Sequence, residues 1–572
     1  MKSRLMILAF FVAVLSFTAG SSLLAQSAMI ATPEQVKAMG GVIGPAVTAV
    51  LQKVWDKAGY AKVKTMEYHG GAGMNAAVGQ QYSINDDWPR FQVDNYVRTT
   101  DFETGQTCEE YTKQQGPNYP PHGGGGTPLI GVHTWKSCVA GDYAWDVVDG
   151  KTIPQVNGHL YGTSEADFRK LDGIICTPIG FLKAAMAPGA NPSMLSIPAN
   201  QSPVHNAGNI RAIAIQALGK YRVVGMIDDR DTVEAVFTWV GNPFIGELDA
   251  QYRYGRFKDF NGVQYPTNLH IHAGDGGISN SHNSQDYYTA DVKWNVPVAP
   301  VTVPDAVKNA KSNVTNVESK KLADGVWLIC GSDLNSVAIE FKDYVAVFEA
   351  PMNEQRSIAV IAEINKLIPN KPIKYVINSS HHWDHAGGLR TYYTQGATVI
   401  TNESNQAYFS KVLFNYVPDR NLMPDRYAYY YVTPGAARAF SNVQYVNHGT
   451  MTLTDGDQSI ELYTVSGPAM FSTEEKDIRM STSTRDVKQF DAVGMLVAYL
   501  PKAKILINAE LYKPEKPGDA PPPVDNNMNM LLGAVKSHHM NVTQVVSIDS
   551  PYVATGEQLE KTVGPVKPVV EE

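Results

Sequence analysis

The chain has 572 residues, which is long for one ordinary domain, so two domains are expected. Its 44% apolar and 18% charged residues are typical of a globular protein and argue against a disordered chain. The formal charge of −8 is small for this length, so it gives no reason to expect nucleic acid or an anionic membrane as a partner.

Residues 1–28 have the pattern of a signal peptide. Lys2 and Arg4 precede an almost unbroken apolar run, Leu5–Phe17, and small residues follow, with cleavage predicted near Ala25 or Ala28. The apolar run is shorter than the ~20 residues that span a bilayer, so no membrane span is expected after cleavage. The pattern predicts a secreted or periplasmic bacterial protein.

Residues 29–296 are predicted to form a β-rich domain. A helical pattern covers Thr32–Tyr60, and short alternating stretches broken by Gly, Pro, Asn and Asp follow from Val63 to Asn295. Such stretches are typical of half-buried antiparallel strands. Two helices are expected within this region, at Ser164–Leu171 and at Ile179–Ala187.

This β-rich region resembles the lipoprotein-carrier type of fold, a curved antiparallel sheet that closes on helices. The resemblance rests on the strand pattern and on the hairpin Asn-Gly-Val-Gln-Tyr-Pro at residues 261–266. If the chain is a non-catalytic binding protein, this sheet is expected to carry an apolar or small-molecule ligand.

Four cysteines allow two interpretations: Cys108, Cys138, Cys176 and Cys330. Cys108 and Cys138 flank a loop-rich region and can pair in an oxidising compartment. Alternatively, all four are buried thiols. No pair has the CxxC spacing of a thiolate metal site.

The Pro-rich stretch 297–305 is predicted to be a linker to a second domain, residues 306–565. There, strands alternate with helices, as in layered folds. The stretch Arg356–Ile368 has its isoleucines on one face, which predicts an amphipathic helix. The apolar strand Ile373–Ile377 follows and leads into a loop rich in histidine.

That loop reads Ser380-His381-His382-Trp383-Asp384-His385-Ala386-Gly387-Gly388. Imidazole and carboxylate at this density are typical of a divalent-metal site. The segment resembles the His-x-His-x-Asp-His loop of the metallo-β-lactamase superfamily, and the resemblance extends over residues 306–563. It implies a four-layer αββα sandwich, so the whole chain is expected to be of the α+β class.

In that family two metal ions lie between facing sheets. By resemblance, His382 matches a ligand of the first metal, and Asp384 and His385 match ligands of the second. Serine occupies the first ligand position of the loop, at Ser380, and His381 is expected to point away from the metals.

The remaining ligand positions follow later strands. No histidine occurs between His448 and His538, so the third ligand of the first metal is replaced by Asp491 or, alternatively, Met470. The bridging carboxylate matches Glu510, and the last histidine of the family is replaced by Asp549.

This oxygen-rich set favours one ion over two and suits Mn²⁺, Fe²⁺, Mg²⁺ or Ca²⁺ better than a dinuclear zinc centre, although Zn, Mn and Fe are not distinguished. A metal with an open position lowers the pKa of a water molecule, which then attacks an ester, amide or phosphoryl centre of a small-molecule substrate. Asp384 or Glu510 would orient that water or take its proton. The alternative is a catalytically inactive binding or scaffold protein that keeps the fold.

Overall fold

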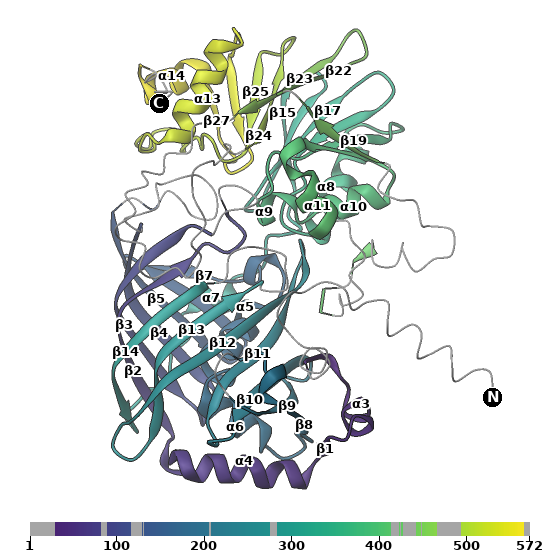
Figure 1. The fold of residues 1–572 in the computed structure, drawn as a ribbon. Coiled ribbons are helices and arrows are strands. Elements are labelled where there is room, and N and C mark those ends of the chain that lie inside the picture. The colour runs from purple at the N-terminus through teal and green to yellow at the C-terminus, as the bar shows by residue number, and fades with distance from the viewer. Residues whose placement is uncertain are drawn as a thin grey trace, which may run out of the picture.

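The computed structural model describes residues 29–81, 88–115, 129, 131–204, 208–274, 283–412, 422–423, 425–426, 442–447, 449–465 and 494–565. Within these ranges the chain forms three sheets, one in the N-terminal half and two in the C-terminal part (Figure 1). The predicted signal peptide lies outside the described residues. No helix of the described ranges has the length and apolar character needed to cross a membrane.

The N-terminal sheet contains fourteen strands in the described residues, and every neighbouring pair is antiparallel. Its order is β1-β8-β9-β10-β11-β12-β13-β14-β2-β3-β4-β5-β6-β7. The strands are β1 (Val42–Ile43), β2 (Thr65–Ala76), β3 (Arg90–Asp101), β4 (Gln106–Gln115), β5 (Val132–Ala140), β6 (Tyr143–Val148), β7 (Lys151–Pro154), β8 (Ser193–Ile197), β9 (Ile210–Ala217), β10 (Tyr221–Asp228), β11 (Val233–Asn242), β12 (Gly246–Asp259), β13 (Gln264–Ala273) and β14 (Asn283–Trp294). The alternating pattern of the sequence therefore predicted the antiparallel sheet correctly, whereas the lipoprotein-carrier resemblance stays a prediction.

The single helix expected at the start of this region is two helices, α3 (Pro33–Ala38) and α4 (Pro45–Ala58). Gly40 and Gly44 separate them with φ angles of 84° and 74°, a left-handed backbone that glycine adopts without strain. The helical periodicity is real within α4, whose buried residues are Val47, Leu51 and Val54. The prediction was wrong only in running through these glycines.

Two further helices, α5 (Glu165–Lys170) and α6 (Pro178–Ala185), are joined by a short π-helical turn, Leu171–Ile175, and pack against the N-terminal sheet. Their positions agree with the two helices expected from the sequence. The packing is close, because a Cβ atom added at Gly225 of β10 would lie 2.1 Å from the ring of Phe181. A residue with a side chain at this position would displace α6 from the sheet.

Cys108 and Cys138 form a disulfide, and Cys176 and Cys330 are buried thiols. The Pro-rich stretch packs on this disulfide, since Val301 and Val303 contact the same apolar cluster. The backbone N–H of Val301 also donates a hydrogen bond of 3.0 Å to Gln106 Oε1. The connection between the two parts of the chain is therefore held against the N-terminal sheet.

The C-terminal part contains two sheets that pack face to face. The first sheet has the strands β15 (Glu318–Ala323), β16 (Val326–Cys330), β17 (Ser336–Glu340), β18 (Val345–Phe348), β19 (Ile373–Ile377), β20 (Thr398–Asn402) and β21 (Val443–Val446). The second has β22 (Thr450–Thr454), β23 (Ser459–Val465), β24 (Met495–Leu500), β25 (Ile505–Asn508), β26 (Gln544–Ser547) and β27 (Val553–Thr555). The helices are α7 (Asp305–Asn309), α8 (Glu354–Leu367), α9 (Trp383–Ala386), α10 (Leu389–Thr394), α11 (Gln406–Val412), α13 (Asn526–Ser537) and α14 (Gly556–Val563).

The apolar clusters show the order of the layers. One cluster joins the inner faces of the two sheets, for example Leu328 and Val337 with Leu462 and Ile507. Helix α8 packs on the other face of the first sheet, and α13 and α14 pack on the other face of the second. This is the four-layer αββα sandwich that the sequence predicted, within a chain of the α+β class.

Candidate metal centre

Four strands of the sandwich end at one place, between the two sheets. Glu349 follows β18, the loop 378–382 follows β19, Glu510 follows β25 and Asp549 follows β26. Strands β18 and β19 are parallel neighbours in the first sheet, and β25 and β26 are parallel neighbours in the second. Because the carboxyl ends of parallel strands share an edge, the residues that follow them come together.

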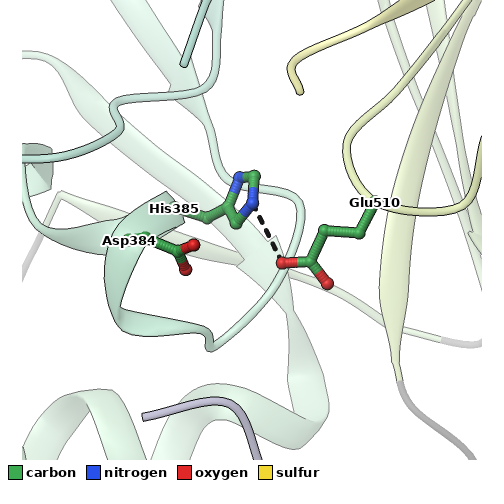
Figure 2. Close-up of side chains that lie close together, drawn as sticks. All are labelled: Asp384, His385 and Glu510. Carbon is green, nitrogen blue, oxygen red and sulfur yellow. Dashed lines mark ion pairs between the residues drawn. The ribbon is translucent and has the colours of Figure 1, made fainter. Parts of the chain in front are cut away.

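The centre of this region is formed by Asp384, His385 and Glu510 (Figure 2). Each offers one ligand atom, and these atoms all lie within 4.8 Å of one another. Asp384 and His385 come from α9, and Glu510 reaches them from the facing sheet, with its Oε1 2.9 Å from His385 Nε2. Asp549 is adjacent, because its Oδ1 lies 3.4 Å from the same nitrogen.

The hydrogen bonding of this group fits a bound cation. His385 is fully buried, yet neither of its ring nitrogens has a hydrogen-bond partner among the described residues, and Asp549 Oδ1 also has none. Carboxylate oxygens of Glu349, Glu510 and Asp549 lie 3.3, 2.9 and 3.4 Å from these nitrogens. Burial would lower the pKa of His385, but the carboxylates, above all Glu510, raise it well above its ordinary value. Leaving buried polar atoms unpaired costs roughly 1–3 kcal/mol each. One imidazole and three carboxylates are a donor set that a divalent ion would satisfy.

His382 is bonded on both sides of its ring. Its Nδ1 lies 2.6 and 2.7 Å from the two oxygens of Glu510, and its Nε2 donates to the carbonyl oxygen of Gln81 at 2.9 Å. Two acceptors favour the protonated ring, which donates from both nitrogens. His382 therefore contacts Glu510 without joining the three-residue group, and its predicted role as a metal ligand stays a prediction.

Burial and charge act in opposite directions on these groups. Burial would lower the pKa of His382, but the Glu510 carboxylate raises it above its ordinary value. Burial would raise the pKa of Glu510, but His382 and His385 hold it well below its usual range. Burial raises the pKa of Asp549 to about 7. Glu510 is thus a carboxylate at neutral pH, which a metal ligand must be.

The N-terminal part of the chain also reaches this site. Gln80 Nε2 donates to Asp384 Oδ1 at 2.7 Å, and the Gln81 carbonyl oxygen accepts from both His381 and His382. Both glutamines are buried, and the amide oxygen of Gln80 has no partner among the described residues. We call residues 79–81 the capping segment. His381, which donates to this segment, is not one of the three residues of the group, and its expected orientation away from the metals stays a prediction.

Glu349 also contacts His385, and the ligand pattern of the sequence did not identify it. It is fully buried, with Oε2 3.3 Å from His385 Nδ1, and it accepts hydrogen bonds from Asn378 and from the backbone and hydroxyl of Ser379. Its φ of 75° is unusual for a residue with a side chain, a strain often found at functional sites. A carboxylate directly after a buried strand was the available signal for it.

The structure thus brings Asp384, His385, Glu510 and Asp549 together, with His382 in contact with Glu510. Asp491 and its alternative Met470 lie outside the described residues. The hydroxyl of Ser380 accepts from the backbone N–H of His382 at 3.3 Å. The capping segment had no signal in the sequence, because Gln80 and Asp384 lie 304 positions apart.

Residues 333–463 match the family model of the metallo-beta-lactamase superfamily. Similar solved structures include the metallo-beta-lactamase from Pontibacter korlensis, with 17% identity over 43% of this chain and 97% of that one and a TM-score of 0.30. The metallo-beta-lactamase from Hirschia baltica has 17% identity over 43% and 95%, with a TM-score of 0.28. FIM-1 from Pseudomonas aeruginosa, in its mono-zinc form, has 14% identity over 43% and 92%, with a TM-score of 0.28. No curated protein matches the chain.

Proposed function

We propose that this chain, whose C-terminal part matches the metallo-β-lactamase superfamily over residues 333–463, is an exported metal-dependent hydrolase of a small-molecule substrate. One divalent ion would be held by Asp384, His385, Glu510 and Asp549. The observation that carries the proposal is the buried imidazole of His385 together with the carboxylates of Asp384, Glu510 and Asp549, which reach it from α9 and from the loops after β25 and β26. Export is supported by the signal-peptide pattern of residues 1–28.

When bound, the ion would act as a Lewis acid and lower the pKa of a water molecule, which suits attack on an ester, amide or phosphoryl bond. Asp384 is only half-buried, whereas His385 and Glu510 are buried, so Asp384 is the most solvent-accessible of these three groups. Gln80 holds Oδ1 of Asp384 and leaves the other oxygen to orient the attacking water or accept its proton. Both oxygens of Glu510 contact imidazoles, which fixes this carboxylate in place.

A single ion is favoured over two because the first position of the family's metal loop is Ser380. In addition, the nitrogens of His382 already have protein partners, Glu510 and the Gln81 carbonyl. Hard oxygen donors dominate the remaining set, so Mn²⁺ or Fe²⁺ is as suitable as Zn²⁺.

Metal content tests the proposal directly. The purified full chain is incubated with Zn²⁺, Mn²⁺ or Fe²⁺, dialysed and analysed by mass spectrometry for metal per chain. We expect about one ion per chain for at least one metal, and its loss in His385→Ala. The variant His69→Ala, at a partly exposed histidine of β2 outside the metal centre, should retain the ion. Retention of none of the three metals would overturn the proposal.

The alternative function is a catalytically inactive binding or scaffold protein, which the protein-bonded state of His382 favours. The metal-loaded chain is assayed with ester, amide and phosphodiester substrates. Hydrolysis that His385→Ala abolishes supports the hydrolase. Stoichiometric metal with no hydrolysis of any of these bonds supports the binding protein instead.

A further inference from the structure

A cavity of about 130 Å³ lies in the N-terminal part of the chain, between the sheet and α5. Strands β2, β4, β5 and β14 form one side, and α5 with the following π-helical turn forms the other. Cavities of similar size in other proteins hold a small organic molecule. None of the residues that line it belongs to the metal centre.

The cavity carries an excess of negative charge. Arg98 contacts Glu109 at 2.5 Å and Asp172 at 3.1 Å. On the other side, Arg169 contacts Glu165 at 2.8 Å and a fourth carboxylate, Asp146, at 2.9 Å. Two guanidinium groups therefore face four carboxylates. Of the charged residues that line the cavity itself, three are carboxylates and one is a guanidinium: Glu109, Glu165, Asp172 and Arg169. Outside this lining, His159 lies 3.2 Å from Glu165, and the Lys113 ammonium acts electrostatically on Asp146.

The unpaired polar atoms that line the cavity include three acceptors. Asn75 Oδ1, Gln285 Oε1 and Asp172 Oδ1 accept no hydrogen bond of normal geometry from the described residues. The Tyr252 hydroxyl is nevertheless close enough to the Asp172 carboxyl group to lower its pKa, against the effect of burial. Asp172 is the most informative of them, because its side chain is only 9% exposed and a carboxylate has no alternative amide orientation. Burial raises the pKa of Asp172 to about 6, because desolvation outweighs the attraction of the Arg98 guanidinium. Asn75 and Gln285 are opposite each other on neighbouring strands.

Aromatic side chains form the rest of the wall. Tyr111, Phe168 and Tyr287 line the cavity. Tyr287 stacks on Tyr96 with ring centroids 4.1 Å apart, and Phe168 stacks on His159 at 3.4 Å, so these rings are held in place. Aromatic rings attract cations through their faces and also accommodate the methylene groups of an organic ligand.

We propose that this cavity binds a small organic cation with a primary ammonium group, whose N–H bonds are accepted by Asp172, Asn75 and Gln285. A primary ammonium has three N–H donors, the same number as these acceptor oxygens. Its positive charge offsets the excess of carboxylates, and its alkyl part contacts the aromatic wall. The side chains of Glu109 and Glu165 are 18% and 12% exposed, so the cavity is accessible from the surface.

Calorimetric titration of the full chain at pH 7.5 tests this proposal with three probes of similar size. n-Butylammonium has charge and N–H donors, tetramethylammonium has charge alone, and n-butanol has a neutral hydroxyl donor. We expect saturable binding of n-butylammonium and at least tenfold weaker binding of the other two. Equal binding of tetramethylammonium or n-butanol, or no saturable binding of n-butylammonium, would overturn the proposal.

Two variants connect the binding to these residues. Asp172→Asn keeps the shape but removes the charge, and Gln285→Ala removes one acceptor outside the ion pairs. Each is expected to weaken n-butylammonium binding, by about tenfold or more for Asp172→Asn, whereas the fully exposed Asp142→Asn leaves it unchanged. Circular dichroism checks that each variant is folded. Unchanged binding in both cavity variants would refute the assignment, independently of the metal centre because no turnover is measured.

Discussion

Replacing Gly79 by alanine should loosen the contact between the capping segment and the metal loop. Gly79 has a φ of 79°, and an added Cβ would lie 2.5 Å from Cδ2 of Trp383. The indole is enclosed by neighbouring side chains. Its ring centroid lies 5.9 Å from those of Trp88 and Phe244, and its N–H donates to the Tyr408 hydroxyl at 2.9 Å. The clash therefore cannot be relieved by a small rotation of the ring.

The magnitude follows from two separate costs. A left-handed backbone costs a residue with a Cβ about 1–2 kcal/mol. Forcing a methyl group into a filled contact costs a further ~1–3 kcal/mol. Gly105 is a matched control, since its φ is 69° but an added Cβ would meet nothing within 4 Å. Gly105→Ala should therefore show only the first cost, and Gly79→Ala should show both.

Chemical unfolding in urea and metal retention after dialysis measure the two consequences. Gly79→Ala should lower the unfolding free energy by ~1–3 kcal/mol more than Gly105→Ala. It should also lower metal retention. Gly79 precedes Gln80, which donates to Asp384, and the displaced Trp383 directly precedes Asp384 in the chain. Equal unfolding midpoints for the two variants, with equal metal content, would refute the contact on which this reasoning depends.

Three other outcomes are expected. Glu510→Gln removes the charge that two imidazoles contact, so metal affinity should fall at least tenfold in an equilibrium titration, and wild-type affinity would contradict the ligand assignment. The pKa of Asp172, about 6 against an ordinary value near 4, means that the folded state holds this proton more tightly than the unfolded state. This stability is present below pH 4 and lost as the pH rises through 6, so Asp172→Asn should gain roughly 3 kcal/mol relative to wild type between pH 4 and pH 7.5, and parallel pH profiles would exclude this effect. The disulfide joins residues 30 positions apart, so replacing both Cys108 and Cys138 by serine should lower the unfolding free energy by roughly 3–4 kcal/mol, a value that an unchanged urea midpoint would contradict.

The resemblance of the His-rich loop, together with the strand and helix patterns around it, predicted the sandwich and suggested the candidate ligands that the structure brings together. The apolar run Ile373–Ile377 predicted a strand, and the apolar face of Arg356–Ile368 predicted a helix. The structure contains both elements. Glu510 and Asp549 were named by resemblance, because each lies two residues after a buried strand where the family has a metal ligand. Parallel strands have their carboxyl ends at the same edge of a sheet. Residues that follow such strands therefore lie close together in space although they are far apart in the sequence.

Contacts between distant parts of the chain were not predictable in this way. Gln80 and Gln81 follow β2 at the far end of the sequence, and nothing in their local pattern distinguishes them from other loop residues. The helix expected over Thr32–Tyr60 failed for a different reason, because two glycines with positive φ interrupted a periodicity that was otherwise correct. In one case the missing information was long-range packing, and in the other it was a local backbone conformation.

The capping segment makes the metal centre a property of both parts of the chain. Without it, Asp384 would lose the amide donor of Gln80, and His382 would lose the carbonyl acceptor that favours its protonated, doubly donating form. A single continuous apolar cluster connects the N-terminal core with Trp383 and α8, so the contact is supported by packing as well as by hydrogen bonds. The ligand loop therefore depends on the N-terminal sheet, whose strands contribute none of the candidate metal ligands. The cavity lined by Asp172 lies against that same sheet.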